Sequence, residues 1–490
     1  MRSAHCGSIL CPVVSDSAPI RFHSSRGKWV IAAAVLGSGI AFLDGTVVNT
    51  ALPAIQADLH TSLAGQQWIL TGYLLTLGSL LVLGGSLGDL FGRRRLFVYG
   101  LVGFSITSML CGLAPNLNVL IAARFLQGVS AAALVPGSLA MLSAVFHPDD
   151  RAKAIGAWSG LATVATALGP FLGGWLIDAV SWRWVFFINV PLAVVAVVIA
   201  ERFVPETHAT SANPSGNAST NSPITRSIDG PGALSLSVGL GGVVFALIEG
   251  PGNGWGPVAI VAAVVGAVSL GAFALIETRS AHPMVPLSMF RSRRFAGANA
   301  VTFVVWGALG AVFFLLAVHL QNDLGYSALE SGAALLPVTV IMMLFSAKSG
   351  DVSQRIGPRL PMTVGPLLVA VGFALMSRVA PGQGYVTVVL PAVLVFASGL
   401  VITVAPLNVT VLAAVEDGRA GVGSAINNAV ARVASLLAIA VLPALSGIAG
   451  SAHGSINSGF SRAMWICVGL AVFGAIISAL TIRNEPGIRR

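Results

Sequence analysis

The chain has 490 residues, of which 55% are hydrophobic and only 9% are charged. Water-soluble domains carry about a quarter charged residues, so this balance excludes an ordinary soluble protein. The formal net charge is +9, but the basic residues lie in short loops, which argues against a nucleic-acid-binding surface. The four cysteines form no CxxC pair and the eight histidines are scattered, so no metal site is predicted.

Apolar segments long enough to cross a bilayer of about 30 Å recur along nearly the whole chain. Residues 1–28 contain no apolar core like that of a cleaved signal peptide, so we expect a cytoplasmic tail there. An N-terminal bundle of six helices is predicted within 29–202. Its helices are expected near residues 29–52, 66–86, 96–114, 117–145, 154–178 and 183–202.

The segment 203–231 has a centre rich in Ser, Thr, Asn and Pro, which predicts a cytoplasmic linker. An inserted transmembrane helix pair is expected at 232–277, followed by a cytoplasmic loop at 278–294. A C-terminal bundle of six helices is predicted at 295–482, with a cytoplasmic tail at 483–490. The expected fold is therefore an all-α polytopic membrane protein with 14 transmembrane helices.

The orientation of these helices follows from their loops, because Lys and Arg in short loops tend to stay in the cytoplasm. With both termini inside, the basic clusters at 93–95, 291–294 and 355–359 all become cytoplasmic. The sequence thus predicts a multi-pass protein of the cytoplasmic (inner) cell membrane with both termini in the cytoplasm.

An internal repeat relates the two bundles. The loop after the second predicted helix aligns by its glycines with the loop after the tenth. The positions Gly85, Asp89, Gly92 and Arg94 correspond to Gly350, Gln354, Gly357 and Arg359. The second copy lacks the acid. Related halves are typical of transporters that bind substrate near the membrane midplane between two bundles.

The first of these loops resembles the signature G-x-L-A-D-R-x-G-R-R of the major facilitator superfamily. The matching residues are Gly85, Leu87, Gly88, Asp89, Gly92, Arg93 and Arg94. Leu90 stands where the family usually has Arg. The fourth-helix signature R-x-x-Q-G is matched by Arg124, Gln127 and Gly128. The fifth-helix antiporter motif G-P-x-x-G-G is matched by Gly169, Pro170, Gly173 and Gly174.

This chain is therefore similar to the fourteen-span drug:proton antiporter branch of that superfamily. The resemblance implies the major facilitator fold, with two six-helix bundles and an inserted helix pair. It also implies proton-coupled efflux of hydrophobic or amphiphilic drugs by alternating access, as in multidrug efflux and antibiotic resistance. We expect no cofactor, the proton gradient as energy source, no enzymatic activity, and a monomer whose partners are a small-molecule substrate and the lipid bilayer.

Two other functions stay open at this stage. The same scaffold could serve as a dedicated exporter, or less readily an importer, of one specific metabolite, because a fold does not fix its substrate. A membrane-embedded sensor or enzyme is the remote alternative.

Asp44 is the acid that the sequence places clearly inside a membrane helix. Burying a carboxylate there is costly, which makes it our leading proton or cation site. The alternative is an Asp held by Thr46 or Asn49 for packing alone. Arg124 lies inside the fourth helix, and the resemblance gives it a proton-coupling role. Its alternative is a structural pairing with other polar groups.

Asp89 and the arginines that follow it are predicted to form a cytoplasmic gate, which charge-assisted hydrogen bonds hold in one conformation. The alternative is anchoring by positive charge alone. The gate residues are Gly85, Asp89, Gly92, Arg93, Arg94, Gly350, Gly357 and Arg359. The antiporter motif is expected to bend the fifth helix and to allow close helix contact that seals the outward side, or else to serve ordinary packing.

A cavity for amphiphilic compounds would use aromatic and polar side chains. Each candidate has ordinary packing or interface anchoring as its alternative. The candidates are Asn49, Trp68, Tyr73, Gln127, Trp158, Trp306, Asn408, Asn427, Asn428 and Arg432.

Overall fold

A computed structural model of the chain describes residues 19–207, 229–252, 254–280, 283–415, 420–448 and 456–483. Within these ranges the chain is helical apart from short connections and an isolated bridge between Ile20 and Phe146. Fourteen helices of this described part are long and apolar enough to cross a membrane. The predicted all-α polytopic fold is thereby confirmed.

The N-terminal bundle contains six membrane-crossing segments. They are α1 (Ser25–Leu59), α2 (Leu63–Phe91), α3 (Arg93–Gly112), α4 (Leu117–Val145), α5 (Pro148–Ala179) and the short α6 (Trp184–Phe187) continued by α7 (Asn189–Phe203). Side chains of Ser24, Ser62 and Asn116 cap α1, α2 and α4 by accepting hydrogen bonds from backbone N–H groups of the first turn. We call the side on which α1 begins the proximal side, and the side on which it ends the distal side.

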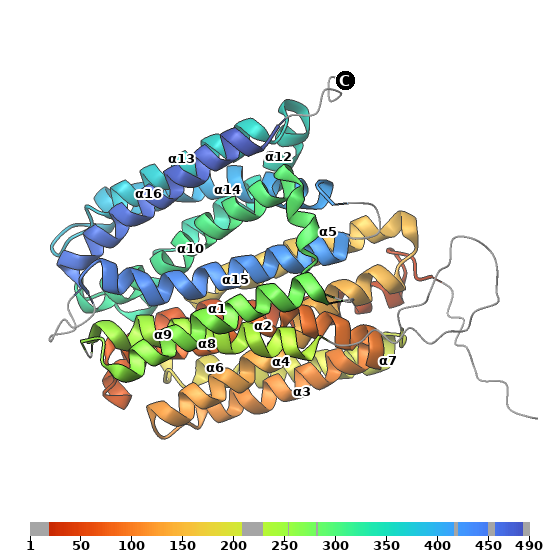
Figure 1. The fold of residues 1–490 in the computed structure, drawn as a ribbon, viewed down its shortest axis with the longest axis horizontal. Coiled ribbons are helices and arrows are strands. Elements are labelled where there is room, and N and C mark those ends of the chain that lie inside the picture. Colours follow the sequence, from red (N-terminus) through yellow and green to blue (C-terminus); the bar gives the residue numbers. More distant parts are fainter. Residues whose placement is uncertain are drawn as a thin grey trace, which may run out of the picture.

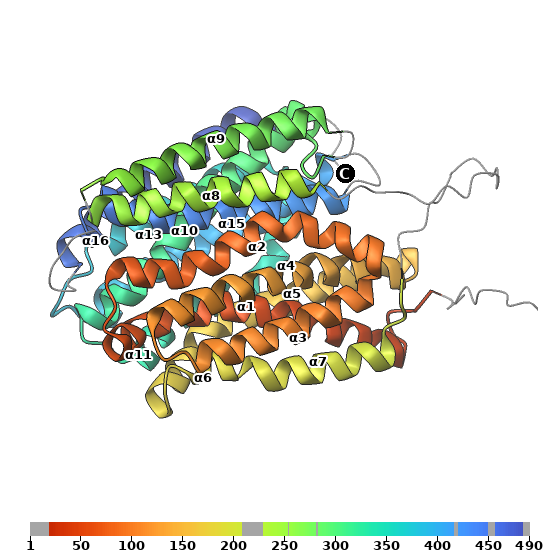
Figure 2. The ribbon, with the colours of Figure 1, turned by 60° about the horizontal axis from the view of Figure 1, so that its bottom comes forward.

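The inserted helix pair consists of α8 (Gly230–Gly252) and α9 (Pro257–Arg279). Helix α8 packs against α2 and against α15 (Ala420–Leu445), and α9 packs against α8 (Figure 2). The indole Nε1 of Trp68 on α2 donates a hydrogen bond to Glu249 Oε1 on α8, at 2.8 Å. Few side chains of α9 are buried. The pair is therefore attached to the outside of the two bundles.

The C-terminal bundle lies beside the N-terminal one along its length (Figure 1). Its other elements are η1 (Leu287–Arg291), α10 (Arg293–Asn322), α11 (Ala328–Ala333), α12 (Leu336–Ile356), α13 (Arg359–Met376), η2 (Tyr385–Val389), α14 (Leu390–Ala413) and α16 (Asn457–Thr481). Helix α10 is the most enclosed of the membrane-crossing helices, with 78% of its most apolar stretch buried. It packs against α14, α15 and α16 of its own bundle and against α1 of the other.

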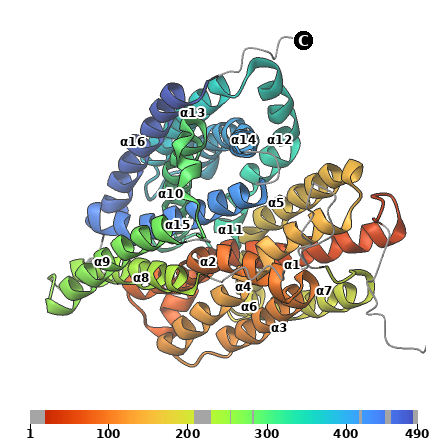
Figure 3. The ribbon, with the colours of Figure 1, turned by 45° about the vertical axis from the view of Figure 1, so that its right-hand side comes forward.

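The two bundles make close contacts on the distal side, where α5 crosses α11 (Figure 3). A Cβ added at Gly174 would lie 2.3 Å from the carbonyl oxygen of Ala328, and one added at Gly332 would lie 2.1 Å from that of Pro170. Only glycine allows backbones to approach so closely. Asp178 also accepts a hydrogen bond from the backbone N–H of Leu329, at 2.9 Å.

The repeated loops share an unusual backbone conformation. Gly92, which ends α2, has φ 102°, and Gly357, which ends α12, has φ 84°. Side chains disfavour this region, so glycine is the natural residue at both helix ends. The alignment of the two loops in the sequence therefore corresponds to the same local structure in both bundles.

Candidate functional site

Asp44 on α1 and Arg124 on α4 form a fully buried ion pair at the centre of the N-terminal bundle. Both residues are 0% exposed, and Arg124 Nη1 donates a hydrogen bond to Asp44 Oδ2. Arg124 also donates from Nε to the carbonyl oxygen of Ile69, at 3.1 Å, and from Nη1 to Gln127 Oε1, at 2.7 Å. A carboxylate, a carbonyl and an amide thus compensate the buried guanidinium.

The second carboxylate oxygen of Asp44 accepts hydrogen bonds from two amides. Gln127 Nε2 lies 3.1 Å from Oδ1, and Asn189 Nδ2 lies 3.3 Å from it. Asn189 donates further to Ser108 Oγ, at 3.0 Å. Asn189 is not among the site residues expected from the sequence. Its position as a polar residue opening an apolar helix was the available signal.

Thr46 and Asn49 are the residues that would hold Asp44 if it served packing alone. Thr46 Oγ1 donates instead to the carbonyl oxygen of Thr166, at 3.0 Å, and Asn49 Nδ2 to that of Gly45, at 3.3 Å. The charged partner of Asp44 is Arg124. This arrangement favours the coupling interpretation of Asp44 over the packing one.

Aromatic rings enclose the ion pair. The guanidinium carbon of Arg124 lies 4.3 Å from the ring centroid of Tyr73 and 5.8 Å from that of Phe186. Tyr73 itself is buried and donates its hydroxyl hydrogen to the carbonyl oxygen of Ala41, at 3.0 Å. Water is excluded, so the attraction between the two charges is strong.

This geometry links protonation of Asp44 to movement of the helices. A proton on Asp44 would neutralise the carboxylate and leave the charge of Arg124 uncompensated in a buried site, which is strongly unfavourable. The strain is relieved only if α1 and α4 move, or if another group replaces the carboxylate. A buried pair of this kind is therefore suited to exchanging a proton during a conformational change.

The remaining cavity candidates of the N-terminal bundle lie in different surroundings. Gln127 and Tyr73 belong to the ion-pair network described above. Trp158 Nε1 donates to Ser38 Oγ, at 2.6 Å, and so ties α5 to α1. Trp68 faces the inserted helix α8, where its ring lies 6.0 Å from that of Phe245. The predicted cavity residues named in this paragraph therefore lie in three separate places: the ion-pair network, the contact between α1 and α5, and the contact between α2 and α8.

The C-terminal candidates include a neutral polar cluster. Asn427 on α15 donates from Nδ2 to Asn299 Oδ1, at 3.2 Å, and to Thr302 Oγ1, at 2.7 Å. Both acceptors lie on α10, so the cluster joins α15 to α10. Asn428 Nδ2 donates to the carbonyl oxygen of Ser424 on its own helix, at 3.1 Å. These side chains hold polarity inside the second bundle without a charge.

The other three C-terminal candidates have no such network. Asn408 is exposed on α14, and Trp306 is partly buried on α10. The guanidinium carbon of Arg432, on α15, lies 5.5 Å from the ring centroid of Phe42 on α1. Arg432 is thus the candidate that reaches across to the other bundle.

The first gate loop is held by two acids. Asp89 Oδ1 accepts from Nε and Nη2 of Arg93, at 3.0 and 2.9 Å. The carboxylate of Glu206 instead accepts from the backbone N–H groups of Arg94 and Arg95, at 3.1 and 3.2 Å, at the positive end of α3. The expected gate combined Asp89 with the arginines that follow it and did not include Glu206. The acid that follows α7 was missed because it is distant in the sequence.

The antiporter motif lies on α5 where this helix meets α1 and α11. A Cβ added at Gly169 would lie 2.1 Å from Thr46 Oγ1, and one added at Gly173 would lie 2.4 Å from Val47 Cγ2. Helix α5 continues through Pro170. With Gly174 against α11, the motif forms a small-residue contact between the bundles.

His319 and Asp323 form a second buried titratable pair, at the distal end of α10. His319 is 0% exposed. His319 Nε2 lies 3.1 Å from the carbonyl oxygen of Val379, and Nδ1 lies 2.7 Å from Asp323 Oδ2. A carbonyl only accepts, so Nε2 carries hydrogen, and the second contact needs one more proton on the imidazole or the carboxyl group. Asp323 is one helical turn from His319, whereas Val379 lies 60 residues away.

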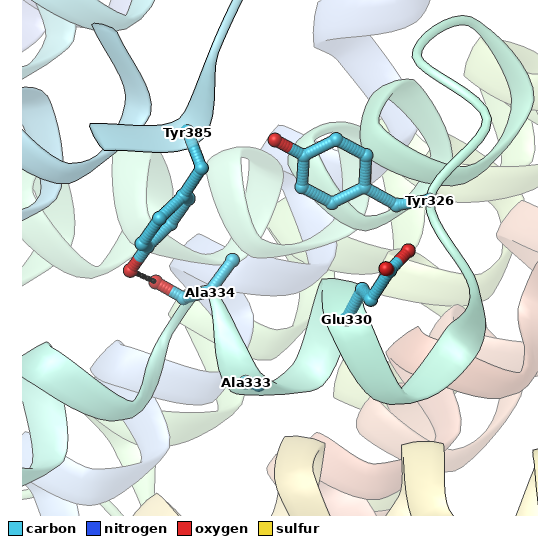
Figure 4. A pocket seen from close by; sticks show the side chains of 5 residues that line it. All are labelled: Tyr326, Glu330, Ala333, Ala334 and Tyr385. Carbon is cyan, nitrogen blue, oxygen red and sulfur yellow. Dashed lines mark hydrogen bonds between the residues drawn. The ribbon is translucent and has the colours of Figure 1, made fainter. Parts of the chain in front are cut away.

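A cavity of about 370 Å³ lies on the distal side of the C-terminal bundle, away from the Asp44 network (Figure 4). Its lining residues are Tyr326, Glu330, Ala333, Ala334 and Tyr385. Tyr385 donates its hydroxyl hydrogen to the carbonyl oxygen of Ala334, at 3.3 Å. Burial, and then the charge of Glu330, raise the pKa of Tyr326.

Comparison with known proteins supports the same picture. Residues 34–439 match the family model described as the Major Facilitator Superfamily. The puromycin resistance protein of Streptomyces alboniger is 34% identical over 96% of this chain and 94% of its own length. The multidrug resistance protein Stp of Mycobacterium tuberculosis is 34% identical over 84% of this chain and 74% of its own length.

Solved structures show the same fold at low sequence identity. A D-xylose–proton symporter superposes with a TM-score of 0.66 at 15% identity, over 94% of this chain and 99% of its own. A bacterial homologue of the human lysosomal transporter Spinster, in an inward-facing and unoccupied conformation, superposes with a TM-score of 0.65 at 18% identity, over 95% and 100% of the two chains.

Proposed function

The chain belongs to the major facilitator superfamily, and on that premise we propose that it exports hydrophobic or amphiphilic small molecules across the cytoplasmic membrane in exchange for protons. The observation that carries the proton coupling is the buried ion pair of Asp44 and Arg124, with its amide partners. The resistance functions in the names of its relatives support the direction of transport, because removal of a compound from the cell confers resistance.

In this proposal a proton displaces Arg124 from Asp44 and so permits α1 and α4 to move relative to each other. The network is buried on every side, so neither membrane face reaches the carboxylate in the state described. A change of conformation must open it to one side at a time. This is the requirement that alternating access imposes on a coupling site.

The distal contact between α5 and α11 supports a state closed to the outside. The glycines at this contact bring two backbones together, and Asp178 bonds to Leu329 across it. If both termini lie in the cytoplasm, the distal side is the outside. We propose this orientation, with the proton gradient as energy source, no cofactor and a functional monomer.

The test is transport by the full-length protein in liposomes with an imposed proton gradient. Ethidium, puromycin and an anionic aromatic compound are the added compounds, and an internal pH dye reports proton movement. Asp44→Asn is expected to reduce substrate-dependent proton flux at least about tenfold, because the amide does not exchange a proton near neutral pH. The matched control is Asp58→Asn on the same helix, where Asp58 is exposed and bonds Arg183.

Two results would count against the proposal. An Asp44→Asn protein with wild-type proton flux would remove Asp44 as the coupling site. Failure of the wild-type protein to move protons with any compound would remove proton-coupled drug export. Movement of puromycin without ethidium would instead favour the dedicated exporter, since one relative is named for puromycin alone.

A further inference from the structure

Arg432 occupies the boundary between the two bundles at the middle of the membrane-crossing helices. It lies near the middle of α15 (Ala420–Leu445). Its guanidinium carbon is 5.5 Å from the ring centroid of Phe42, which is near the middle of α1. A Cβ added at Gly78, in the centre of α2, would lie 3.3 Å from Arg432 Cβ. Transporters with two related halves bind substrate at this level.

The charge of Arg432 has no acidic partner among the residues that the structure describes. Its contact there is the face of Phe42, whereas Arg124 bonds a carboxylate, a carbonyl and an amide. A guanidinium offers five N–H donors. Placing such a group at this depth without a carboxylate is costly and marks a functional position.

No group of the described residues accepts a hydrogen bond from Arg432, so its donors are unused there. Its side chain is partly exposed, while Asp44 and Arg124 are completely buried. The negative charge of Asp44 is already compensated by Arg124. Phe42, which contacts Arg432, lies two residues before Asp44 on α1, so this cation is near the proposed coupling site. The boundary between the bundles therefore carries an uncompensated positive charge at this level.

We propose that Arg432 binds an acidic group of the transported compound, and that the substrates of this protein are amphiphilic organic acids with an aromatic ring system. The inference deepens the proposed export function and rests on it. A carboxylate or phenolate oxygen accepts the planar N–H groups of the guanidinium, in the paired geometry that arginine favours. The ring of Phe42, on the other bundle, packs against the apolar part of the same compound.

The site discriminates by charge. An organic anion supplies the partner that Arg432 lacks, so binding gains a charge-assisted hydrogen bond in a poorly hydrated place. A permanent cation meets a like charge there and gains nothing from Arg432. Contacts to both bundles also let one compound bridge Phe42 and Arg432, so that binding is sensitive to how the halves sit relative to each other.

The experiment compares two dyes that share a xanthene scaffold, the anion fluorescein and the cation rhodamine 123. Binding to the full-length protein in detergent is measured by fluorescence anisotropy, and transport is measured in liposomes. The variants are Arg432→Gln and Arg432→Lys, with Arg378→Gln, an exposed arginine after α13, as the control. Melting temperatures of all variants verify that they are folded.

We expect Arg432→Gln to weaken fluorescein binding by about tenfold or more, as loss of a charge-assisted hydrogen bond implies. Rhodamine 123 should bind the variant as well as, or better than, it binds the unaltered protein. Arg432→Lys should retain part of the fluorescein affinity because the charge remains but the planar fork is lost. Arg378→Gln should change neither dye.

Equal loss of both dyes in a folded Arg432→Gln protein would overturn the inference, as would unchanged binding of fluorescein. Failure of the wild-type protein to bind fluorescein at all would overturn it too. None of these results depends on proton coupling, since anisotropy is measured without a gradient. Failure of the proposed function appears separately, as absence of proton flux in the liposome assay.

Discussion

The two bundles carry related gate loops but hold different polar groups between their helices. In the N-terminal bundle, Asp44 and Arg124 form an ion pair that two amides complete. In the C-terminal bundle, near the beginnings of α10 and α15, Asn427 bonds Asn299 and Thr302 without any charge. A charged pair changes its interactions on protonation and a neutral cluster does not, so the difference assigns proton coupling to the first bundle in the proposed function.

The two gate loops also differ in charge, because only the first copy has an acid at the aligned position. Gly92 and Gly357 adopt similar left-handed conformations, so the backbone has been retained in both copies. The first copy has Asp89 bonded to Arg93, while Gln354 stands at the corresponding position of the second. A Cβ added at Gly350 would meet open space. The acid at the helix end is therefore a feature of the first bundle.

Replacing Arg124 by Ala is expected to have the largest effect. Asp44 would remain buried without its cation, which costs about 3–5 kcal/mol of stability and abolishes proton-coupled transport. Melting temperature in detergent and proton flux in liposomes measure the two effects. The double variant Asp44→Asn/Arg124→Gln should regain stability but not transport. If the single variant Arg124→Ala still couples transport to protons, the assignment of proton coupling to the N-terminal bundle is wrong.

Replacing His319 by Leu tests whether the second bundle also contributes a titratable pair. The substitution removes bonds to Asp323 and Val379 and should lower stability by about 1–3 kcal/mol. Proton stoichiometry, measured as protons moved per molecule of transported substrate, should stay unchanged. The control is His23→Leu, an exposed histidine before α1. A changed stoichiometry would show that coupling is shared between the bundles.

Replacing Asn427 by Leu should have the smallest effect. Two neutral hydrogen bonds between α15 and α10 would be lost, and each contributes about 0.6 kcal/mol in a membrane protein. We expect a small drop in melting temperature and intact proton coupling. Asn428→Leu is the matched control, because Asn428 bonds only its own helix. Loss of proton coupling in Asn427→Leu but not in Asn428→Leu would contradict the assignment of proton coupling to the N-terminal bundle.

Much of the fold could be predicted from the sequence because the physical signals are local. Each membrane-crossing helix needs about 20 apolar residues in a row, and such runs can be read directly. The main differences lie at helix ends: α1 runs to Leu59, beyond the expected 52, because a helix continues through Pro53 when its neighbours pack around it. Asp44 was found for the same local reason, as an acid inside an apolar run.

The hydrogen-bond partners within the site could not be predicted in this way, because they come from distant parts of the chain. Arg124 lies 80 residues from Asp44, and Asn189 lies 145 residues from it. Glu206 reaches the start of α3 from 112 residues away. No pattern along one helix encodes these distances, since they depend on which faces the helices turn toward each other.

The sequence by itself determined that this protein spans a membrane with 14 helices in two related halves, because hydropathy and glycine positions are written along the chain. Only the tertiary structure decided which polar groups compensate one another. Burial makes an unpaired charge costly, so packing selects the partners. In the packed structure Asp44 forms an ion pair with Arg124, and Glu206 accepts a hydrogen bond from the first gate loop. Arg432 faces Phe42 across the boundary of the two bundles.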